Sequence, residues 1–226
     1  MIKVKITKNS SIISCIYHNL VNGEHMTETG IQFDGREYLA GNFLIAMPGM
    51  GDSRFEKSVI YICAHTDKGA MGFVINRSLY KPTIKEFFTQ LGIINENEAD
   101  SLVPNIKDIQ LCSGGPVEPG RGFVLHSPEF NGESTLAVDE NVSLTATLEI
   151  LRAIVTGKGP KDILLTLGYS GWASGQLEKE IVSNGWLICP SDSSIIFSEK
   201  NALKYERALN ILGVDPVLLS ADSGHA

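Results

Sequence analysis

The sequence has no long apolar run, no paired cysteine motif and no excess of positive charge. Because no apolar segment approaches the roughly 18 residues needed to cross a bilayer, we expect no membrane-spanning segment. The net charge of −7, from 19 Lys and Arg against 26 Asp and Glu, opposes the attraction to phosphate on which nucleic-acid binding depends. The cysteines form no CxxC pair, which favours reduced thiols and a cytoplasmic protein; they are Cys15, Cys63, Cys112 and Cys189.

The length and composition indicate one globular domain behind a poorly specified leader. A chain of 226 residues with 43% hydrophobic and 20% charged residues is long enough to bury a sizeable core. Residues 1–37 are weakly periodic, and Met26 stands where a shorter product could start. We therefore assign residues 1–37 to an N-terminal leader and residues 38–226 to a single domain.

Apolar runs separated by turn residues predict several strands. Residues 162–167 are almost continuously apolar, which indicates a central strand covered on both faces. The segment 95–108 is acidic and is most simply a solvated connection. The expected strands are residues 43–47, 58–64, 70–76, 134–138, 162–167, 186–188 and 194–197.

Capping signals predict the helices. Thr83 and Glu86 form a capping box before an apolar face that ends at Gly92. Strands arrive both as hairpins and as strand–helix–strand units, so the fold class is α+β with a mixed sheet. Further helices are expected with Thr145 as the cap, after a turn at 168–172, and over about 202–212.

A double glycine at residues 113–116, Ser-Gly-Gly-Pro, lies between two apolar runs. Paired glycines between buried strands indicate either a close backbone approach or a ligand seat. The next segment, Glu118 to Arg121, fits a type II turn, with Pro119 fixing φ and Gly120 supplying a positive φ. A further apolar run then ends at His126.

The same stretch offers a candidate nucleophile. Ser113 or Cys112 with His65 or His126 would suit a hydrolase or a thiol-dependent enzyme. However, Leu111 and Cys112 replace the Gly-Asp that chymotrypsin-like proteases place before the serine, which favours a tight structural turn.

Three other patterns suggest a function but are explained equally well by ordinary structural roles. Cys63, His65 and Cys112 could gather around a soft metal, but their spacing matches no zinc motif, so no metal or cofactor is expected. The turn at 168–171 could seat a phosphate, although it lacks the glycine spacing of known phosphate loops. The basic residues 200, 204 and 207 share one helix face, which we interpret as a solvated face.

Taken together, the segments resemble the AlgH/YqgE family of small bacterial proteins. The resemblance covers roughly residues 38–226 and implies a bifurcated sheet, partly curled into a small closed barrel and surrounded by helices. Family members have been labelled transcriptional regulators, but no reaction is established for them, and Tyr205 stands where the family has a tryptophan. The matching segments are residues 41–48, 58–63, 65, 69–76, 114–117, 121–126, 167–169, 172, 175–178 and 224–226.

The sequence favours a cytoplasmic, non-enzymatic binding or regulatory protein. Its partner would be a small ligand or another protein, and the absence of a basic recognition helix argues against the alternative, a DNA-binding regulator. Ligands commonly sit where glycine turns and polar side chains gather at strand ends. The candidate ligand-binding residues are Asn76, Arg77, Gly114, Gly115, Arg121, His126, Gly168, Gly171 and Trp172.

Overall fold

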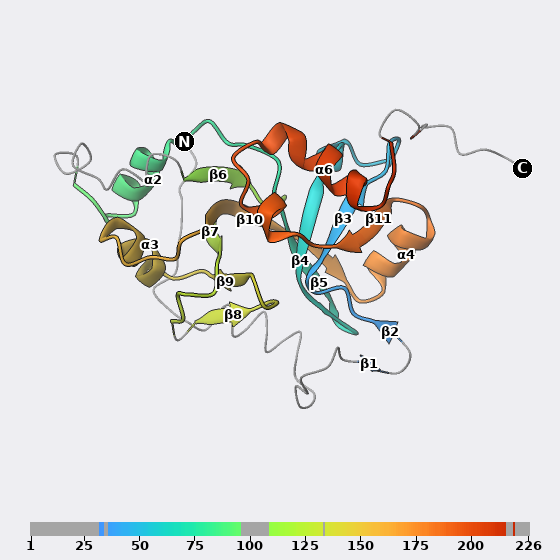
Figure 1. Cartoon of the computed structure of the whole chain (residues 1–226), viewed down its shortest axis with the longest axis horizontal. Helices are drawn as coiled ribbons and strands as arrows, with labels where there is room; N and C mark the ends of the chain where they lie inside the picture. The colour runs from blue at the N-terminus through green and yellow to red at the C-terminus, as the bar shows by residue number, and fades with distance from the viewer. Residues whose placement is uncertain (1–31, 34–35, 96–108, 133, 216–218, 220–226) are drawn as a thin grey trace, which may run out of the picture.

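The computed structural model describes residues 32–33, 36–95, 109–132, 134–215 and 219, and most of them surround one nine-stranded sheet (Figure 1). Two further strands, β1 (Gln32–Phe33) and β2 (Arg36–Glu37), pair only with each other. In spatial order the large sheet consists of β11 (Trp186–Pro190), β3 (Asn42–Ala46), β4 (Val59–Thr66), β5 (Gly69–Val74), β10 (Ile163–Ala173), β7 (Val117–His126), β9 (Ser143–Thr145) and β8 (Thr135–Ala137), with β6 (Gln110–Ser113) beside β10.

The long strand β10 is where the sheet divides. Its first half lies between the parallel strand β6 and the antiparallel strand β7, whereas its last residues pair with β5. The antiparallel strands curl into a half-barrel, since the series of paired strands ends at β8 and β11 without closing. The predicted α+β class with a mixed, bifurcated sheet is confirmed, and the barrel portion, expected to be closed, is a half-barrel.

Glycines make the division of the sheet possible. A Cβ on Gly114 would lie 2.3 Å from the carbonyl oxygen of Gly168, and a Cβ on Gly115 would lie 2.3 Å from the carbonyl carbon of Tyr169. The amide of Gly114 donates to the Leu167 oxygen at 2.8 Å, and its carbonyl accepts from Val74 at 2.8 Å. The double glycine is therefore a close backbone crossing, one of the two roles expected from the sequence.

Both faces of the β3–β4–β5 region are buried, which explains its nearly continuous apolar sequence. Phe43 and Tyr61 point into the core that α6 (Lys204–Ile211) and the half-barrel cover, while Leu44 and Ile60 point towards α4 (Gln176–Val182). Figure 1 shows α6 above β3 and β4, and α4 at the end of the molecule near β11.

A third core lies at the other end of the molecule, beneath α2 (Ile84–Gln90) and α3 (Leu148–Val155). The Thr83 capping box is confirmed, because the Glu86 amide donates to the Thr83 hydroxyl at 3.2 Å and the Glu86 carboxylate accepts from the Thr83 amide at 2.8 Å. Gly92 follows with a φ of 66°. The remaining helical segments in the described part of the chain are η1 (Ser53–Phe55), α5 (Ser193–Ile196) and η3 (Asn201–Leu203).

Two predicted turns are wrong because both lie inside strands. Gly168 has a φ of 73°, but β10 continues through Trp172 to Ala173, so the residue makes a bulge and not a strand-to-helix turn. Similarly, β7 runs straight through the predicted type II turn, and the positive φ of 46° belongs to Glu118 and not to Gly120.

Two helix predictions and one strand prediction also need correction. Thr145 does not cap a helix, because it is the last residue of β9, and α3 begins after Thr147. Residues 194–197 do not form a strand, since the Asp192 carboxylate accepts from the Ser194 amide at 2.8 Å and starts α5. Lys204 is fully buried, so the basic face predicted on the last helix does not exist.

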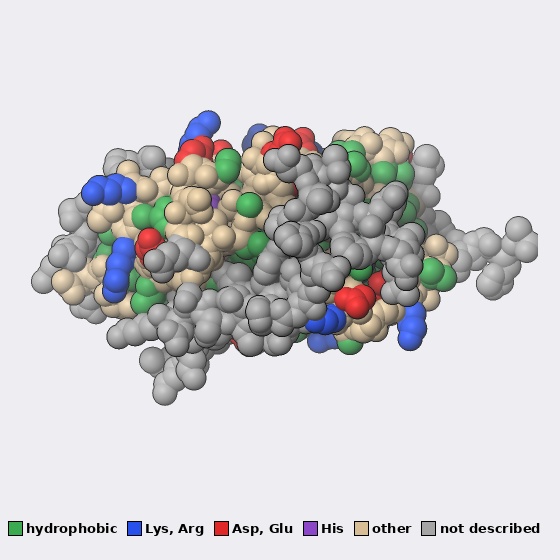
Figure 2. Space-filling view, turned by 90° about the horizontal axis from the view of Figure 1, so that it is seen from below, with side chains coloured by type: hydrophobic (Ala, Val, Ile, Leu, Met, Phe, Trp, Pro, Cys, Tyr) green, Lys and Arg blue, Asp and Glu red, His purple; other side chains and the backbone are tan. Residues whose placement is uncertain are grey.

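The described surface carries charges of both signs. Seen from below, Lys and Arg side chains are interspersed with Asp and Glu and with apolar side chains (Figure 2). None of the described helices is both long and apolar enough to span a bilayer. The predicted connection at 95–108, apart from Asn95, and most of the predicted leader lie outside the described residues.

Candidate functional site

A cleft of about 850 Å³ opens between the loop after β3, the end of β10 and helix α4. Its walls combine methionine, proline and aromatic side chains with a few polar groups. The described lining residues are Met47, Pro48, Gly49, Met50, Gly51, Asp52, Arg54, Phe55, Pro116, Gly171, Trp172, Gln176, Glu180, Ser183, Asn184, Gly185, Trp186 and Leu219.

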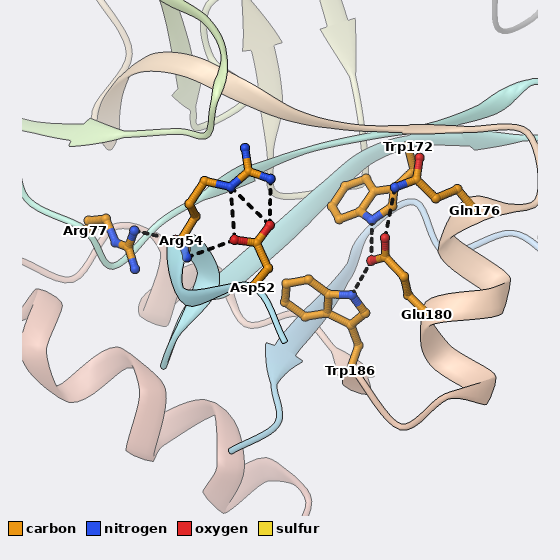
Figure 3. Close-up of polar contacts among 7 residues, drawn as sticks. All are labelled: Asp52, Arg54, Arg77, Trp172, Gln176, Glu180 and Trp186. Atoms are coloured by element: carbon orange, nitrogen blue, oxygen red, sulfur yellow. Dashed lines mark hydrogen bonds and ion pairs between the residues drawn. The ribbon is translucent and has the colours of Figure 1, made fainter. Parts of the chain in front are cut away.

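One wall of the cleft is a cluster of two tryptophans around a carboxylate. The indole N–H groups of Trp172 and Trp186 each donate to Oε2 of Glu180 at 2.8 Å (Figure 3). The Gln176 amide donates to the other carboxylate oxygen at 2.9 Å. The two indole rings lie edge to face with centroids 6.1 Å apart, so the carboxylate fixes the position of both rings.

Three separate elements bring this cluster together. Trp172 lies near the end of β10, Trp186 begins β11, and Glu180 stands one turn beyond Gln176 on α4. Both tryptophans are buried, at 7% and 3% exposure, so their N–H groups need the partner that Glu180 provides. We call these residues, Trp172, Gln176, Glu180 and Trp186, the tryptophan clamp.

The opposite wall is built on the short helix η1. Asp52 caps this helix by accepting from the Arg54 amide at 3.0 Å, and its carboxylate also accepts from the Arg54 guanidinium, the shortest contact being 2.6 Å. These bonds from Arg54 lower the pKa of Asp52. Figure 3 shows this pair on the side of the cleft facing the two indoles.

Two of the predicted site residues, Asn76 and Arg77, hold this wall in place from outside the cleft. Asn76 accepts from the Val59 amide at 2.9 Å and donates to the Lys57 carbonyl at 2.8 Å. Arg77 donates to the carbonyls of Arg54 and Glu56. They fix the backbone on which Asp52 and Arg54 stand, and neither is among the lining residues.

The other predicted residues divide into three groups. Gly171 and Trp172 line the cleft directly. Gly114, Gly115 and Gly168 form the backbone crossing of the sheet, which leads into Pro116 at the edge of the cleft. The third group, Arg121 and His126, is not brought to the cleft.

His126 belongs to the half-barrel. It pairs with Ile163 at the start of β10, whereas Trp172 lies near the other end of this strand, up to about 30 Å away along the strand at a rise of about 3.3 Å per residue. Nδ1 of His126 donates to the Ser127 carbonyl at 2.8 Å, and Nε2 accepts from the Thr145 hydroxyl at 2.9 Å. Burial lowers the pKa of His126, which fits a neutral, structural ring.

Arg121 is also buried, at 7% exposure, and pairs with Glu118 at 3.0 Å. Its guanidinium carbon lies 5.0 Å from the centroid of the Phe123 ring. Sequence reasoning placed Arg121 with the other candidates because it follows the double glycine closely, but its side chain packs on β7.

The candidate nucleophiles do not meet a histidine base. Cys112 is fully buried and contacts the Ile75 carbonyl and the Asn201 amide, and burial raises the pKa of its thiol to about 11. Ser113 pairs with Leu167 on β10. His65 pairs with Ala70 on β5, and Ala70 in turn pairs with Trp172 on β10. Leu167 and Trp172 are roughly 15 Å apart along β10, so Ser113 and His65 lie at different levels of the sheet.

His65 has partners of its own. Its Nδ1 accepts from the Leu39 amide at 3.1 Å, and its Nε2 contacts the Glu178 carboxylate at 3.3 Å. Cys63 is buried, and burial raises the pKa of its thiol. Among the described residues no group of three or more His, Cys, Asp or Glu side chains is placed to hold a metal ion.

Sequence reasoning missed Asp52, Arg54, Glu180 and Trp186 as site residues. Asp52 and Arg54 are close in sequence at η1, but no local motif links this pair to Glu180 on α4 or to Trp186 on β11. One signal was present: the chain has only two tryptophans, and both stand close in sequence to Glu180.

The fold defines an α+β protein whose mixed sheet divides at one long strand. This chain belongs to the AlgH-like family, whose model (DUF179) matches residues 43–217, so the predicted kinship is confirmed. A UPF0301 protein of Beijerinckia indica is 53% identical over 190 residues, covering 84% of this chain and 93% of the relative. A UPF0301 protein of Methylobacterium nodulans is 48% identical over 203 residues, covering 89% and 97%.

Solved structures similar to this chain include one from Pseudomonas aeruginosa and one from Corynebacterium diphtheriae. The solution structure of the AlgH protein from Pseudomonas aeruginosa is 38% identical, with a TM-score of 0.65, and the match covers 87% of this chain and all of that one (100%). A crystal structure of a Corynebacterium diphtheriae protein, 18% identical with a TM-score of 0.53 over 70% of this chain and 79% of that one, shares the fold alone.

Proposed function

We propose that this AlgH-like protein is a non-enzymatic binding or regulatory protein and that the cleft beside the tryptophan clamp is its ligand site. The observation that carries the proposal is the cleft itself. Its volume of about 850 Å³ falls in the range of small-molecule sites, and its walls combine apolar and aromatic side chains with polar groups that are held in place by hydrogen bonds. The ligand is a small molecule or a short segment of a protein partner.

The cytoplasmic setting remains part of this proposal. Cys63, Cys112 and Cys189 are free thiols and are buried, which suits a reducing compartment.

The alternatives receive less support from the geometry. An enzyme based on Ser113 or Cys112 needs a base within hydrogen-bonding reach, and both candidate histidines are bonded elsewhere. A DNA-binding regulator needs a basic surface, but the negative net charge and the buried position of Lys204 work against one.

A ligand survey with a cleft-blocking variant tests the proposal. Purified protein would be screened for thermal stabilisation by a library of small metabolites and short peptides, because a ligand that binds only the folded state raises the melting temperature. Compounds that stabilise the wild type would then be tested on Ser183→Phe, which adds a ring at the exposed cleft-lining end of α4.

The matched control is Lys179→Phe, which adds the same ring at an exposed position of α4 outside the lining. We expect stabilisation to disappear in Ser183→Phe and to persist in Lys179→Phe. Equal stabilisation of both variants, or no stabilising compound in the library, would refute the proposed site.

A further inference from the structure

We infer that the ligand of this cleft carries an organic cation, an ammonium group on an apolar frame. The inference rests on the proposed function and adds the chemical class of the ligand. It comes from the charges in the cleft, from the unused acceptor position of Glu180, and from the aromatic and methionine side chains beside it.

The described lining of the cleft carries one uncompensated negative charge. The charged residues among the described lining are Asp52, Arg54 and Glu180. Asp52 and Arg54 neutralise each other through contacts as short as 2.6 Å. Among the described residues, Glu180 accepts only from neutral groups, two indoles and one side-chain amide, and these hold its charge in place without cancelling it.

Glu180 also keeps an acceptor position for a ligand. A carboxylate offers about four lone-pair positions, and the three described N–H groups use two on Oε2 and one on Oε1. An ammonium N–H can take the remaining position on Oε1. Such a charge-assisted bond is stronger than one between neutral groups, which favours a cation over a neutral donor.

The neighbouring walls suit both parts of such a ligand. Trp172, Trp186 and Phe55 line the same cleft, and aromatic rings attract organic cations and pack against apolar frames. Met47 and Met50 add flexible apolar surface that adapts to the shape of a ligand. An anion would instead meet the uncompensated carboxylate and is disfavoured.

Calorimetric titration with three probes on closely similar aromatic frames tests this inference. The probes are 2-phenylethylammonium, the neutral 2-phenylethanol and the anionic 3-phenylpropanoate. We expect the cation to bind at least about tenfold more tightly than the neutral probe and the anion to bind most weakly.

Glu180→Gln removes the charge but keeps an amide oxygen that can accept from the indoles, and Glu178→Gln removes an equal charge from the same helix outside the cleft. We expect Glu180→Gln to abolish the preference for the cation, with the neutral probe bound as before, and Glu178→Gln to keep the preference. Far-ultraviolet circular dichroism checks that both variants are folded.

Equal or tighter binding of the neutral or anionic probe to the wild type refutes the inference, as does a cation preference that survives Glu180→Gln. If no probe binds while the survey finds neutral or anionic ligands blocked by Ser183→Phe, the ligand class is wrong and the proposed site stands. If the survey finds no ligand blocked in that way, both fail. The same calorimetric titration with short lysine-containing peptides distinguishes the two sources of the cation. Tighter binding of a peptide than of 2-phenylethylammonium indicates a protein segment, and weaker binding indicates a free small molecule.

Discussion

The buried amine of Lys204 makes a quantitative prediction about stability. Its Nζ donates to the carbonyls of Ile75 at 2.9 Å and Ile196 at 2.8 Å, and its exposure is 0%. Burial lowers the pKa of Lys204 from 10.5 to about 8. The side chain therefore holds α6 against Ile75, the residue after β5, and against α5 best when the amine is neutral, because a neutral amine still has two N–H donors for the two carbonyls.

Replacing this lysine with methionine removes both the unfavourable burial of a charge and the favourable hydrogen bonds of the amine. Lys204→Met ends the cost of burying a charge, about 3 kcal/mol at pH 7 for such a pKa difference. It also leaves the buried Ile196 carbonyl without its donor, at about 1–3 kcal/mol, whereas the Ile75 carbonyl keeps the Cys112 thiol at 3.8 Å. The two contributions are of similar size, so we expect the variant and the wild type to differ by less than about 2 kcal/mol at pH 7.

The decisive quantity is how that difference changes with pH. Because the folded pKa lies below the unfolded pKa, the unfolded chain binds more protons between pH 8 and 10.5, and this lysine makes the folded state more stable as pH rises. Between pH 7 and 9.5 the wild type should gain about 2 kcal/mol of unfolding free energy relative to Lys204→Met. Urea unfolding of both proteins at both pH values measures this gain, and the difference cancels the titration of groups that do not interact with Lys204. A difference that stays constant within about 0.5 kcal/mol would refute the reasoning.

Three other predictions concern stability. Gly115→Ala should lower the unfolding free energy by at least about 3 kcal/mol, because the new Cβ would overlap the Tyr169 carbonyl. Gly51→Ala is the control: its Cβ would meet open space, so the same urea titration should show a change of less than about 0.5 kcal/mol. The wild type should lose stability from pH 7 to pH 5, since burial holds the folded pKa of His126 below that of the unfolded chain; His126→Gln should show a shallower loss, and an unchanged slope would contradict this. Thr83→Ala should cost about 1 kcal/mol by removing the cap of α2, and unchanged urea unfolding would show that the capping box adds no stability.

Local signals in the sequence predicted much of the fold. The continuous apolar runs around Phe43 and Tyr61 indicated strands covered on both faces, and the structure covers both faces. The Thr83 capping box predicted a helix start correctly because the signal lies within four neighbouring residues.

The errors arose where distant contacts override local signals. Gly168 indicated a turn, but its positive φ serves a bulge where β10 passes the double glycine. Lys204 seemed to belong to a solvated face, because the helical pattern does not reveal that two carbonyls from other elements surround its amine.

The candidate site was only partly predicted from the sequence, because contacts between residues that are distant in the sequence also build the site. Gly171 and Trp172 were predicted because a glycine-rich stretch points to strand ends, where ligands often bind. Glu180 and Trp186 have no local signature, and their roles become visible only when β10, α4 and β11 are brought together.

The central claim is that the cleft beside the tryptophan clamp binds the ligand, and the two indole N–H groups test it most directly. The chain contains only two tryptophans, and both indoles donate to Glu180 in this cleft, so a ¹H–¹⁵N spectrum contains two indole signals that report on it. The compound that stabilises the protein most in the ligand survey should shift both signals until they saturate, at the affinity measured by calorimetry. A compound that binds with that affinity but leaves both indole signals unmoved would show that the ligand site lies elsewhere.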